Sequence, residues 1–221
     1  MTEIIPAILA HTEMELRAKL AALPPDAEAV HVDFLPRGLL EGFLGVFSSL
    51  DSQNLARDKL RLEAHLMLPH PQEYIDDLVK AGFGRVIVQV SEEPHQMFEA
   101  HQHLVRLNTA VPPEAFADLV HEWRKVVEIA PSLEINTPLE VIDSFAHEIE
   151  SVQLMGIAEI GAQGHPFDPR VIHRVETLHT KYPHLTISVD GGVNKKNAKK
   201  LAVAGATRLV VGSAIGEFYG R

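Results

Sequence analysis

The chain has 221 residues, of which 46% are apolar and 23% are charged. This composition is typical of a folded globular protein and excludes a disordered chain, a collagen-like repeat and a small disulfide scaffold. Lysine and arginine number 20 and aspartate and glutamate number 30, which gives a formal net charge of −10. We therefore expect neither nucleic acid nor an anionic membrane as a partner. The sequence contains no cysteine, so any metal site must use histidine and carboxylate ligands.

The first residues, Met1 to Glu3, form neither a basic nor an apolar segment of the kind that begins a secretory signal. No stretch of the sequence reaches the roughly 18 apolar residues that a membrane-spanning helix requires. The sequence therefore predicts a cytoplasmic protein.

Eight short segments rich in β-branched and apolar residues recur along the chain. Several are apolar almost throughout, which is typical of parallel strands that are buried on both faces. In chain order, they are Ile4–Leu9, Ala29–Phe34, Leu60–Leu68, Arg85–Val90, Leu133–Ile135, Val152–Ile157, Thr186–Val189 and Arg208–Val211.

Helical patterns lie between several of these strands, and proline or glycine residues mark many of their ends. The predicted helices are Glu13–Leu23, Pro71–Ala81, Pro138–Glu148, Pro169–Lys181 and Asn197–Ala204. Alternating strands and helices favour a parallel sheet. Eight strands in a chain of this length predict one (β/α)8 barrel over residues 1–221 rather than two domains.

Residues 91–113 are the irregular part of this pattern, because they separate two strands by more residues than one helix needs. The stretch contains His95, His101 and His103. The spacing of His101 and His103 suits two faces of a helix, and we expect all three to be surface histidines. The chain ends at Arg221, which leaves room for only a short eighth helix. A second subunit could cover the apolar surface left there, so we expect a homo-oligomer.

Four ionisable residues stand at or near the ends of predicted strands, where barrels of this type carry their catalytic groups. His31 and Asp33 are two residues apart on one strand and so share a face, His65 lies in the third strand, and Asp190 follows the seventh. Taken singly, each has a plain interpretation: a His–Asp hydrogen bond, a core histidine or a turn residue. If the barrel closes, all four can converge, and such a nitrogen and oxygen ligand set suits Zn²⁺, Fe²⁺, Mn²⁺ or Co²⁺.

Glycines follow the last three strands of the predicted barrel. Loops after strands seven and eight recur as phosphate sites in such barrels, because glycine lets backbone N–H groups approach the anion. They could instead be ordinary turns between strand and helix. The residues concerned are Gly191 and Gly192 after the seventh strand and Gly212 and Ser213 after the eighth, with Gly161 and Gly164 as a further wall after the sixth.

Taken in order, these segments resemble the ribulose-phosphate 3-epimerase family over nearly the whole chain. No single segment is specific, but the ordered set is. The matching segments are Ile5–Leu9, His31–Asp33, His65–Met67, Asn136–Glu140, Leu154–Met155, Val189–Val193 and Val211–Ile215.

The resemblance implies a (β/α)8 barrel of the ribulose-phosphate-binding type and a role for each matching residue. His31, Asp33, His65 and Asp190 fall on the family's metal ligands, and Asp33 and Asp190 also on its two acid/base carboxylates. The remaining positions fall on substrate or phosphate contacts: Ala7, His65, Met67, Met155, Gly161, Gly164, Gly191, Gly192, Gly212 and Ser213.

The chain departs from the family's pattern in the residues around the substrate. Ala7 replaces a serine, Leu35 replaces a methionine and Gln89 replaces a histidine. The loop at residues 34–38 lacks the family's acidic residue, and the loop at residues 158–165 carries an apparent insertion. The positions of the metal ligands and of the two acid/base carboxylates therefore match the family, whereas several positions around the substrate differ from it.

The resemblance implies a metal-dependent isomerase of carbohydrate metabolism, in the pentose phosphate series, acting on a small sugar phosphate. The expected reaction converts D-ribulose 5-phosphate to D-xylulose 5-phosphate by two-carboxylate proton transfer through an enediolate, with one divalent metal ion. The changed loops leave two alternatives open: 3-epimerisation of a six-carbon ketose phosphate, and a non-catalytic barrel that binds metal or phosphate. A sugar-phosphate decarboxylase or synthase is disfavoured, because its Asp-x-Lys-x-x-Asp motif is absent at the third strand.

Overall fold

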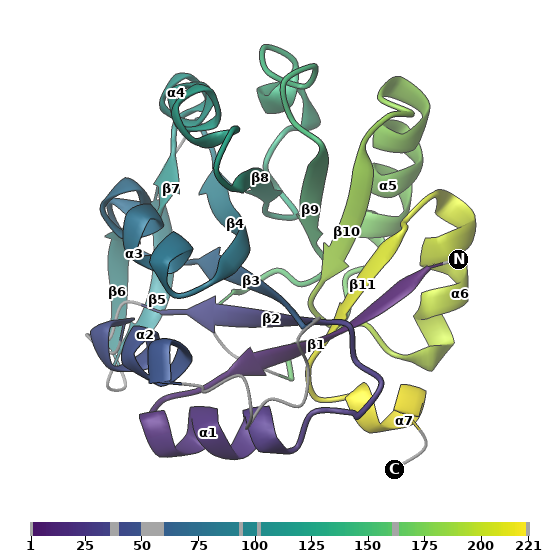
Figure 1. Ribbon diagram of the computed structural model, residues 1–221. Helices are drawn as coiled ribbons and strands as arrows, with labels where there is room; N and C mark the ends of the chain where they lie inside the picture. Colours follow the sequence, from purple (N-terminus) through teal and green to yellow (C-terminus); the bar gives the residue numbers. More distant parts are fainter. Residues whose placement is uncertain are drawn as a thin grey trace.

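Eight parallel strands of the computed structural model pair side by side in a closed ring, with helices outside it (Figure 1). The structure describes residues 2–35, 40–49, 60–92, 95–100, 103–160 and 164–219. Around the ring the order is β3, β2, β1, β11, β10, β9, β8 and β4, and pairing of β3 with β4 closes it. The predicted (β/α)8 barrel is therefore confirmed. The strands are β1 (Glu3–Leu9), β2 (Ala29–Phe34), β3 (Arg61–Leu66), β4 (Phe83–Val90), β8 (Glu128–Leu133), β9 (Ser151–Met155), β10 (Thr186–Asp190) and β11 (Arg208–Val211).

Helices surround the strands and bury apolar faces against them. On α5 the buried residues Val171, Val175 and Leu178 recur at helical spacing, so one stripe of the helix faces the sheet. In the described part of the chain, each helix is too short or too polar to cross a lipid bilayer. The helices are α1 (Glu13–Ala21), α2 (Leu40–Ser49), α3 (Ile75–Lys80), α4 (Pro113–Trp123), α5 (Arg170–Lys181), α6 (Lys195–Ala204) and α7 (Ile215–Tyr219), with 3₁₀ turns η1 (Pro71–Tyr74) and η2 (Leu139–Ile142).

Two predicted elements are wrong in position or type. The fifth barrel strand is Glu128–Leu133 rather than Leu133–Ile135. It contains Pro131, which lacks an N–H and normally argues against a strand in the middle of a sheet. The helix predicted over Pro138–Glu148 is only the 3₁₀ turn η2 followed by further turns.

The irregular segment at residues 91–113 contains an antiparallel hairpin of β5 (His95–Ala100) and β6 (His103–Asn108). A short strand, β7 (Ala110–Val111), then pairs with β4. His103 begins a strand, so the helical interpretation of its spacing is wrong. His101 lies outside the described residues, and so do the side chains of His95 and His103. Their predicted exposure stays a prediction.

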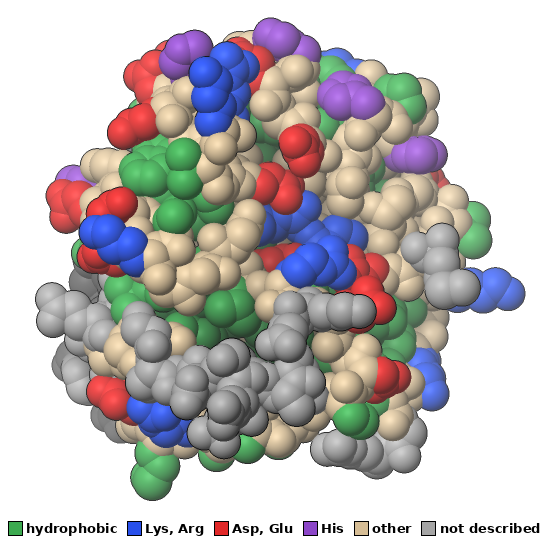
Figure 2. All heavy atoms as spheres, viewed as in Figure 1, with side chains coloured by type: hydrophobic (Ala, Val, Ile, Leu, Met, Phe, Trp, Pro, Cys, Tyr) green, Lys and Arg blue, Asp and Glu red, His purple; other side chains and the backbone are tan. Residues whose placement is uncertain are grey.

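A network of buried ion pairs fills the barrel where the strands begin, which we call the base. Arg208 contacts Glu63 and donates from Nε to Glu3 Oε2 at 3.1 Å. Arg85 Nη2 donates to Glu128 Oε1 at 2.7 Å and its Nη1 lies 3.7 Å from Glu63 Oε1. In Figure 2, basic side chains gather in the hollow at the middle of the face shown, with acidic side chains around them. The two arginines share Glu63, and Glu3 and Glu128 supply each arginine with a second carboxylate, so the charges at the base are paired.

We expect Arg208→Ala to lower the free energy of unfolding by roughly 3–5 kcal/mol, since it leaves the buried Glu63 carboxylate without its close partner. Arg61→Ala is the matched control, because Arg61 also contacts Glu3 but is 57% exposed, and should cost less than about 1 kcal/mol. Urea unfolding followed by circular dichroism measures both. Equal losses for the two variants would contradict the importance of the buried pair.

Candidate active site

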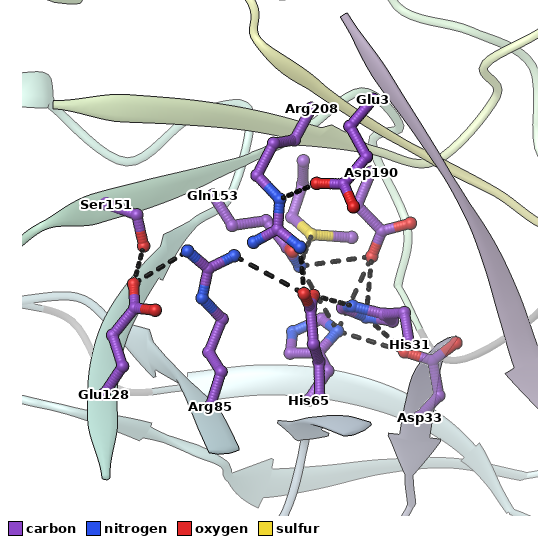
Figure 3. A network of polar contacts seen from close by, with 12 residues as sticks. Glu3, His31, Asp33, His65, Arg85, Glu128, Ser151, Gln153, Asp190 and Arg208 are labelled. Atoms are coloured by element: carbon purple, nitrogen blue, oxygen red, sulfur yellow. Dashed lines mark hydrogen bonds and ion pairs between the residues drawn. The ribbon is translucent and has the colours of Figure 1, made fainter. Parts of the chain in front are cut away.

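The structure brings together His31, Asp33, His65 and Asp190 inside the barrel. One ligand atom from each lies within 4.8 Å of all the others. Asp33 and His65 are register partners on β2 and β3, and strand alternation puts His31 on the same face as Asp33. Asp190 ends β10, which reaches the others only because the barrel closes. Figure 3 shows the four side chains converging.

The distances in this cluster identify which ring nitrogens face inward. His65 Nδ1 lies 3.0 Å from Asp33 Oδ1 and 3.6 Å from Asp190 Oδ2. His31 Nε2 lies 3.4 Å from Asp33 Oδ1 and 3.7 Å from Asp190 Oδ2. The two carboxylates and two imidazoles thus direct two nitrogens and two oxygens at a common point, a donor set that Zn²⁺ and similar ions accept.

His31 provides the clearest indication that a cation fits here. Its ring is fully buried, and neither ring nitrogen has a hydrogen-bond partner among the described residues. Burial lowers the pKa of His31, but the carboxylates of Asp33 and Glu63 outweigh burial and raise that pKa to about 10. The surroundings therefore favour positive charge at this ring, which a metal ion could supply.

The two carboxylates have different environments. Burial disfavours the charged form of Asp33, yet the neighbouring imidazoles of His31 and His65 hold its pKa well below the usual range. Burial raises the pKa of Asp190 to about 6, against the opposing pull of His31. Gln153 Nε2 donates to Asp190 Oδ2 at 3.2 Å and so holds the inner oxygen of this carboxylate.

The outward nitrogens of the two histidines have different neighbours. His31 Nδ1 lies 3.7 Å from Glu63 Oε2, the same carboxylate that the base arginines contact. His65 Nε2 lies 2.7 Å from the side-chain nitrogen of Gln89. Groups behind a metal ligand fix its orientation and its tautomer, so Glu63 and Gln89 are candidates for that role.

A pocket of about 410 Å³ opens beside the cluster, and both carboxylates line it. His31 and His65 lie behind it, each with no exposed surface. Of the predicted contacts, Gly161 is outside the described residues, as are residues 36–38 of the loop at 34–38. The predicted residues that do line the pocket are Ala7, Asp33, Met67, Met155, Gly164, Asp190, Gly191, Gly192, Gly212 and Ser213.

Close packing requires glycine at two of these positions. Gly191 has φ +98°, and a Cβ there would lie 2.8 Å from Ile157 Cγ1. Gly192 has φ +67°, and a Cβ there would lie 2.7 Å from Phe167 Cα. The turn geometry and the close packing therefore explain why glycine stands at both positions, apart from any contact with a ligand in the pocket.

Several residues around the centre were absent from the sequence prediction. Glu63 and Gln153 each stand two residues before a predicted site residue, so strand alternation could have placed them on the same face. Gln89 entered the sequence prediction only as the residue that replaces a family histidine. Glu217 also lines the pocket, and its carboxylate accepts from the Lys195 N–H at the start of α6 at 3.1 Å. This acidic group comes from α7, for which the sequence predicted only a short helix.

We expect His31→Gln to weaken binding of Zn²⁺ by more than about 100-fold, because loss of a ligand should cost more than loss of a group behind one. His173→Gln is the control, since His173 lies on α5 and is 85% exposed, and should bind as the unchanged protein does. Isothermal titration calorimetry at fixed pH measures the affinities. Unchanged affinity in His31→Gln would exclude this cluster as the metal site.

Comparison with known proteins identifies one family over nearly the whole chain. The model of the ribulose-phosphate 3-epimerase family matches residues 3–216. The chain is 31% identical to the ribulose-phosphate 3-epimerase of Schizosaccharomyces pombe over 72% of this chain and 61% of that protein. It is 30% identical to that of Bacillus subtilis, over 71% and 65%. The matched region thus spans about three fifths of the length of the first of these relatives.

Solved structures share the fold at low sequence identity. The 3-hexulose-6-phosphate synthase of Salmonella typhimurium superposes with a TM-score of 0.67 at 13% identity, over 99% of this chain and 94% of that one. Phosphoribosyl anthranilate isomerase of Thermotoga maritima gives 0.60 at 14%, over 100% and 92%. These similarities concern the barrel alone, whereas the family model covers the strands that carry the cluster, and the chain belongs to the ribulose-phosphate 3-epimerase family.

Proposed function

We propose that the protein is a metal-dependent 3-epimerase of a ketose phosphate, with D-ribulose 5-phosphate and D-xylulose 5-phosphate as its substrate pair. The observation that carries the proposal is that two carboxylates, Asp33 and Asp190, meet in one cluster and line one pocket. Inversion at a carbon requires a base on one face and an acid on the other. Membership of the epimerase family supports the same chemistry.

The reaction needs one group to remove a proton and one to return it, and these two side chains can fill both roles. One carboxylate removes the proton from C3, and the other, protonated, returns a proton to the opposite face. The different environments of Asp33 and Asp190 suit two roles, because one stays ionised while the pKa of the other is about 6. Zn²⁺, Fe²⁺, Mn²⁺ or Co²⁺ held by His31, Asp33, His65 and Asp190 would supply Lewis-acid polarisation of the neighbouring carbonyl.

The remaining pocket residues would bind and enclose the sugar. Met67 and Met155 are buried, 3% exposed each, and line the pocket beside the carboxylates. Their thioethers would exclude water from the reacting carbons. Gly191, Gly192, Gly212 and Ser213 line the same pocket and would hold the phosphate. A cytoplasmic location and homo-oligomeric assembly stay predictions of the sequence.

A six-carbon ketose phosphate is the second candidate substrate. The methyl group of Ala7 lines the pocket in place of a hydroxyl side chain, which removes a polar contact and leaves space. A non-catalytic barrel is less well supported, because both carboxylates stand at the pocket.

Proton exchange in D₂O tests the function. The protein, loaded with Zn²⁺, Mn²⁺ or Fe²⁺, is incubated with D-ribulose 5-phosphate or a six-carbon ketose 6-phosphate, and C3 is followed by NMR. We expect deuterium at C3 together with the epimer, and loss of both after a chelator. Exchange with the six-carbon sugar alone would favour the second candidate, and no exchange with either sugar would refute the epimerase.

Asp33→Asn and Asp190→Asn should each lower kcat by at least about 100-fold, the usual contribution of a positioned acid or base. Asp143→Asn is the control, because Asp143 pairs on the surface with Lys181. Metal content measured on every variant separates loss of the ion from loss of the proton carrier. Wild-type turnover in either metal-loaded active-site variant would contradict the two-carboxylate scheme.

Ser213→Asp should raise KM at least about tenfold, which is 1.4 kcal/mol of repulsion between the new carboxylate and a bound phosphate. Ser213→Ala controls for loss of the hydroxyl, and initial rates at varied substrate concentration give both constants. If KM does not change in Ser213→Asp, the phosphate binds elsewhere.

A further inference from the structure

Gln89 contacts the one nitrogen of the metal-site histidines that no carboxylate faces. The outward nitrogen of His31 has Glu63 at 3.7 Å. That of His65 has the Gln89 amide at 2.7 Å. Gln89 is 1% exposed, so bulk water does not compete for this contact. A side-chain amide, unlike a carboxylate, can either donate or accept at the position it occupies.

The orientation of this amide determines where a neutral His65 ring carries its proton. With the Gln89 nitrogen toward His65 Nε2, that ring nitrogen must accept, and the proton lies on Nδ1. Nδ1 then donates to Asp33 Oδ1, 3.0 Å away. In this tautomer a proton occupies the direction in which His65 would offer its lone pair to a metal ion, so the ring is closed to metal. Gln153 Nε2, 3.5 Å from Nδ1, then donates to Asp190 rather than to the ring.

The opposite orientation opens the site. If the Gln89 amide turns over, its Oε1 replaces the nitrogen at His65 Nε2 and accepts an N–H from it. The proton then leaves Nδ1, whose lone pair faces Asp33 and Asp190. In the orientation observed, Gln89 Oε1 has no hydrogen-bond partner among the described residues, so the turn breaks no contact of that oxygen.

Two other polar side chains lie at the same level of the barrel as Gln89. Ser132 is the register partner of Gln89 on β8, and it is followed across the sheet by Gln153 on β9. Ser132 Oγ and Gln153 Oε1 also lack partners among the described residues. Strand register thus places two further oxygen-bearing side chains on the same face as Gln89.

We propose that Gln89 is a positioning residue that turns its side-chain amide when the centre binds metal, donating to His65 Nε2 in the metal-free protein and accepting from it in the loaded one. The inference rests on the metal site of the proposed function. Both states keep the buried ring nitrogen hydrogen-bonded, which avoids the cost of an unpaired polar atom. Gln89 thereby selects the His65 tautomer that each state of the site requires.

The first test is metal affinity, measured by calorimetry with Zn²⁺. Gln89→Met removes both donor and acceptor at similar volume and should weaken binding 10- to 100-fold. Gln89→Glu restores an acceptor for the Nε2 proton and should bind at least as tightly as the unchanged protein. Val88→Ala, a buried change on the outer face of the same strand, controls for general loss of stability and should not alter affinity. Equal affinity in Gln89→Met and the unchanged protein would overturn the proposal.

The second test reads the tautomer directly, and its main comparison is the unchanged protein with and without metal. Long-range ¹H–¹⁵N NMR of ¹⁵N-histidine protein, assigned with His65→Gln, is recorded where the ring is neutral. We expect the His65 proton on Nδ1 without metal and on Nε2 with Zn²⁺. In metal-free Gln89→Glu the proton should already lie on Nε2, a change that a purely structural role would not produce. A proton on Nε2 in the metal-free unchanged protein would overturn the switch.

These outcomes separate the inference from the function. A Gln89→Met protein that binds Zn²⁺ normally while the unchanged protein epimerises its substrate refutes the role of Gln89 alone. A protein that shows the affinity loss and the tautomer change but exchanges no C3 proton refutes the epimerase and leaves the metal switch in place.

Discussion

Charged groups inside an apolar barrel must be balanced, and the interior of this protein is built around that requirement. Among the described residues, ionisable side chains gather on the inner face of the strands. Four form the cluster, and Glu3, Glu63, Arg85, Glu128 and Arg208 form the base. An unpaired charge in such a place costs several kcal/mol. The strand register brings opposite charges together, since Glu63 is the register partner of both His31 and Arg85 on neighbouring strands. The ring of strands therefore positions the site and satisfies its charges by the same pairing.

Glu63 connects the two ends of this interior. One of its oxygens contacts Arg208 and Arg85, and the other faces His31 Nδ1. The arginines hold the carboxylate in place, and the carboxylate orients the imidazole. Precision at the centre thus depends on ion pairs several residues away, where the strands begin. This dependence explains why the base of a barrel carries buried charge at all, although apolar packing there would be less costly.

The sequence predicted the parts of the structure that follow from strand geometry. The predicted limits of β2 and β11 match the structure, because β-branched valines recur along both short segments. The convergence of four ligand residues followed from alternation along a strand and from closure of the barrel. The fifth strand was misplaced because Pro131 contradicts the local rule, and tertiary pairing with β4 overrides it.

Strand alternation can place a missed residue on the inner face, but it does not show which residues of the neighbouring strands lie beside it. Gln89, Ser132 and Gln153 lie in three adjacent strands, and only the register of the sheet shows that they share a level. An uncharged amide in an apolar strand does not reveal whether it donates or accepts. The glycine loops were predicted as a phosphate site, yet Gly191 and Gly192 also have a packing reason that sequence alone does not separate from ligand binding.

Charge balance also constrains what the pocket can accept. Without metal, Asp33 and Asp190 ionised and His31 protonated give −1 − 1 + 1 = −1, and Glu217 adds a further negative charge to the pocket wall. A dianionic sugar phosphate would enter such a pocket against repulsion. With a divalent cation, neutral rings and both carboxylates ionised the centre sums to 2 − 2 = 0, and with one carboxylate protonated, as the proposed reaction requires, to 2 − 1 = +1. In either state the negative charge at the reacting end is removed.

Metal binding would therefore do more than activate a carbonyl. It would make an acidic protein with an acidic site compatible with an anionic substrate, and a neutral amide at Gln89, in place of a second carboxylate like Glu63, keeps that balance intact.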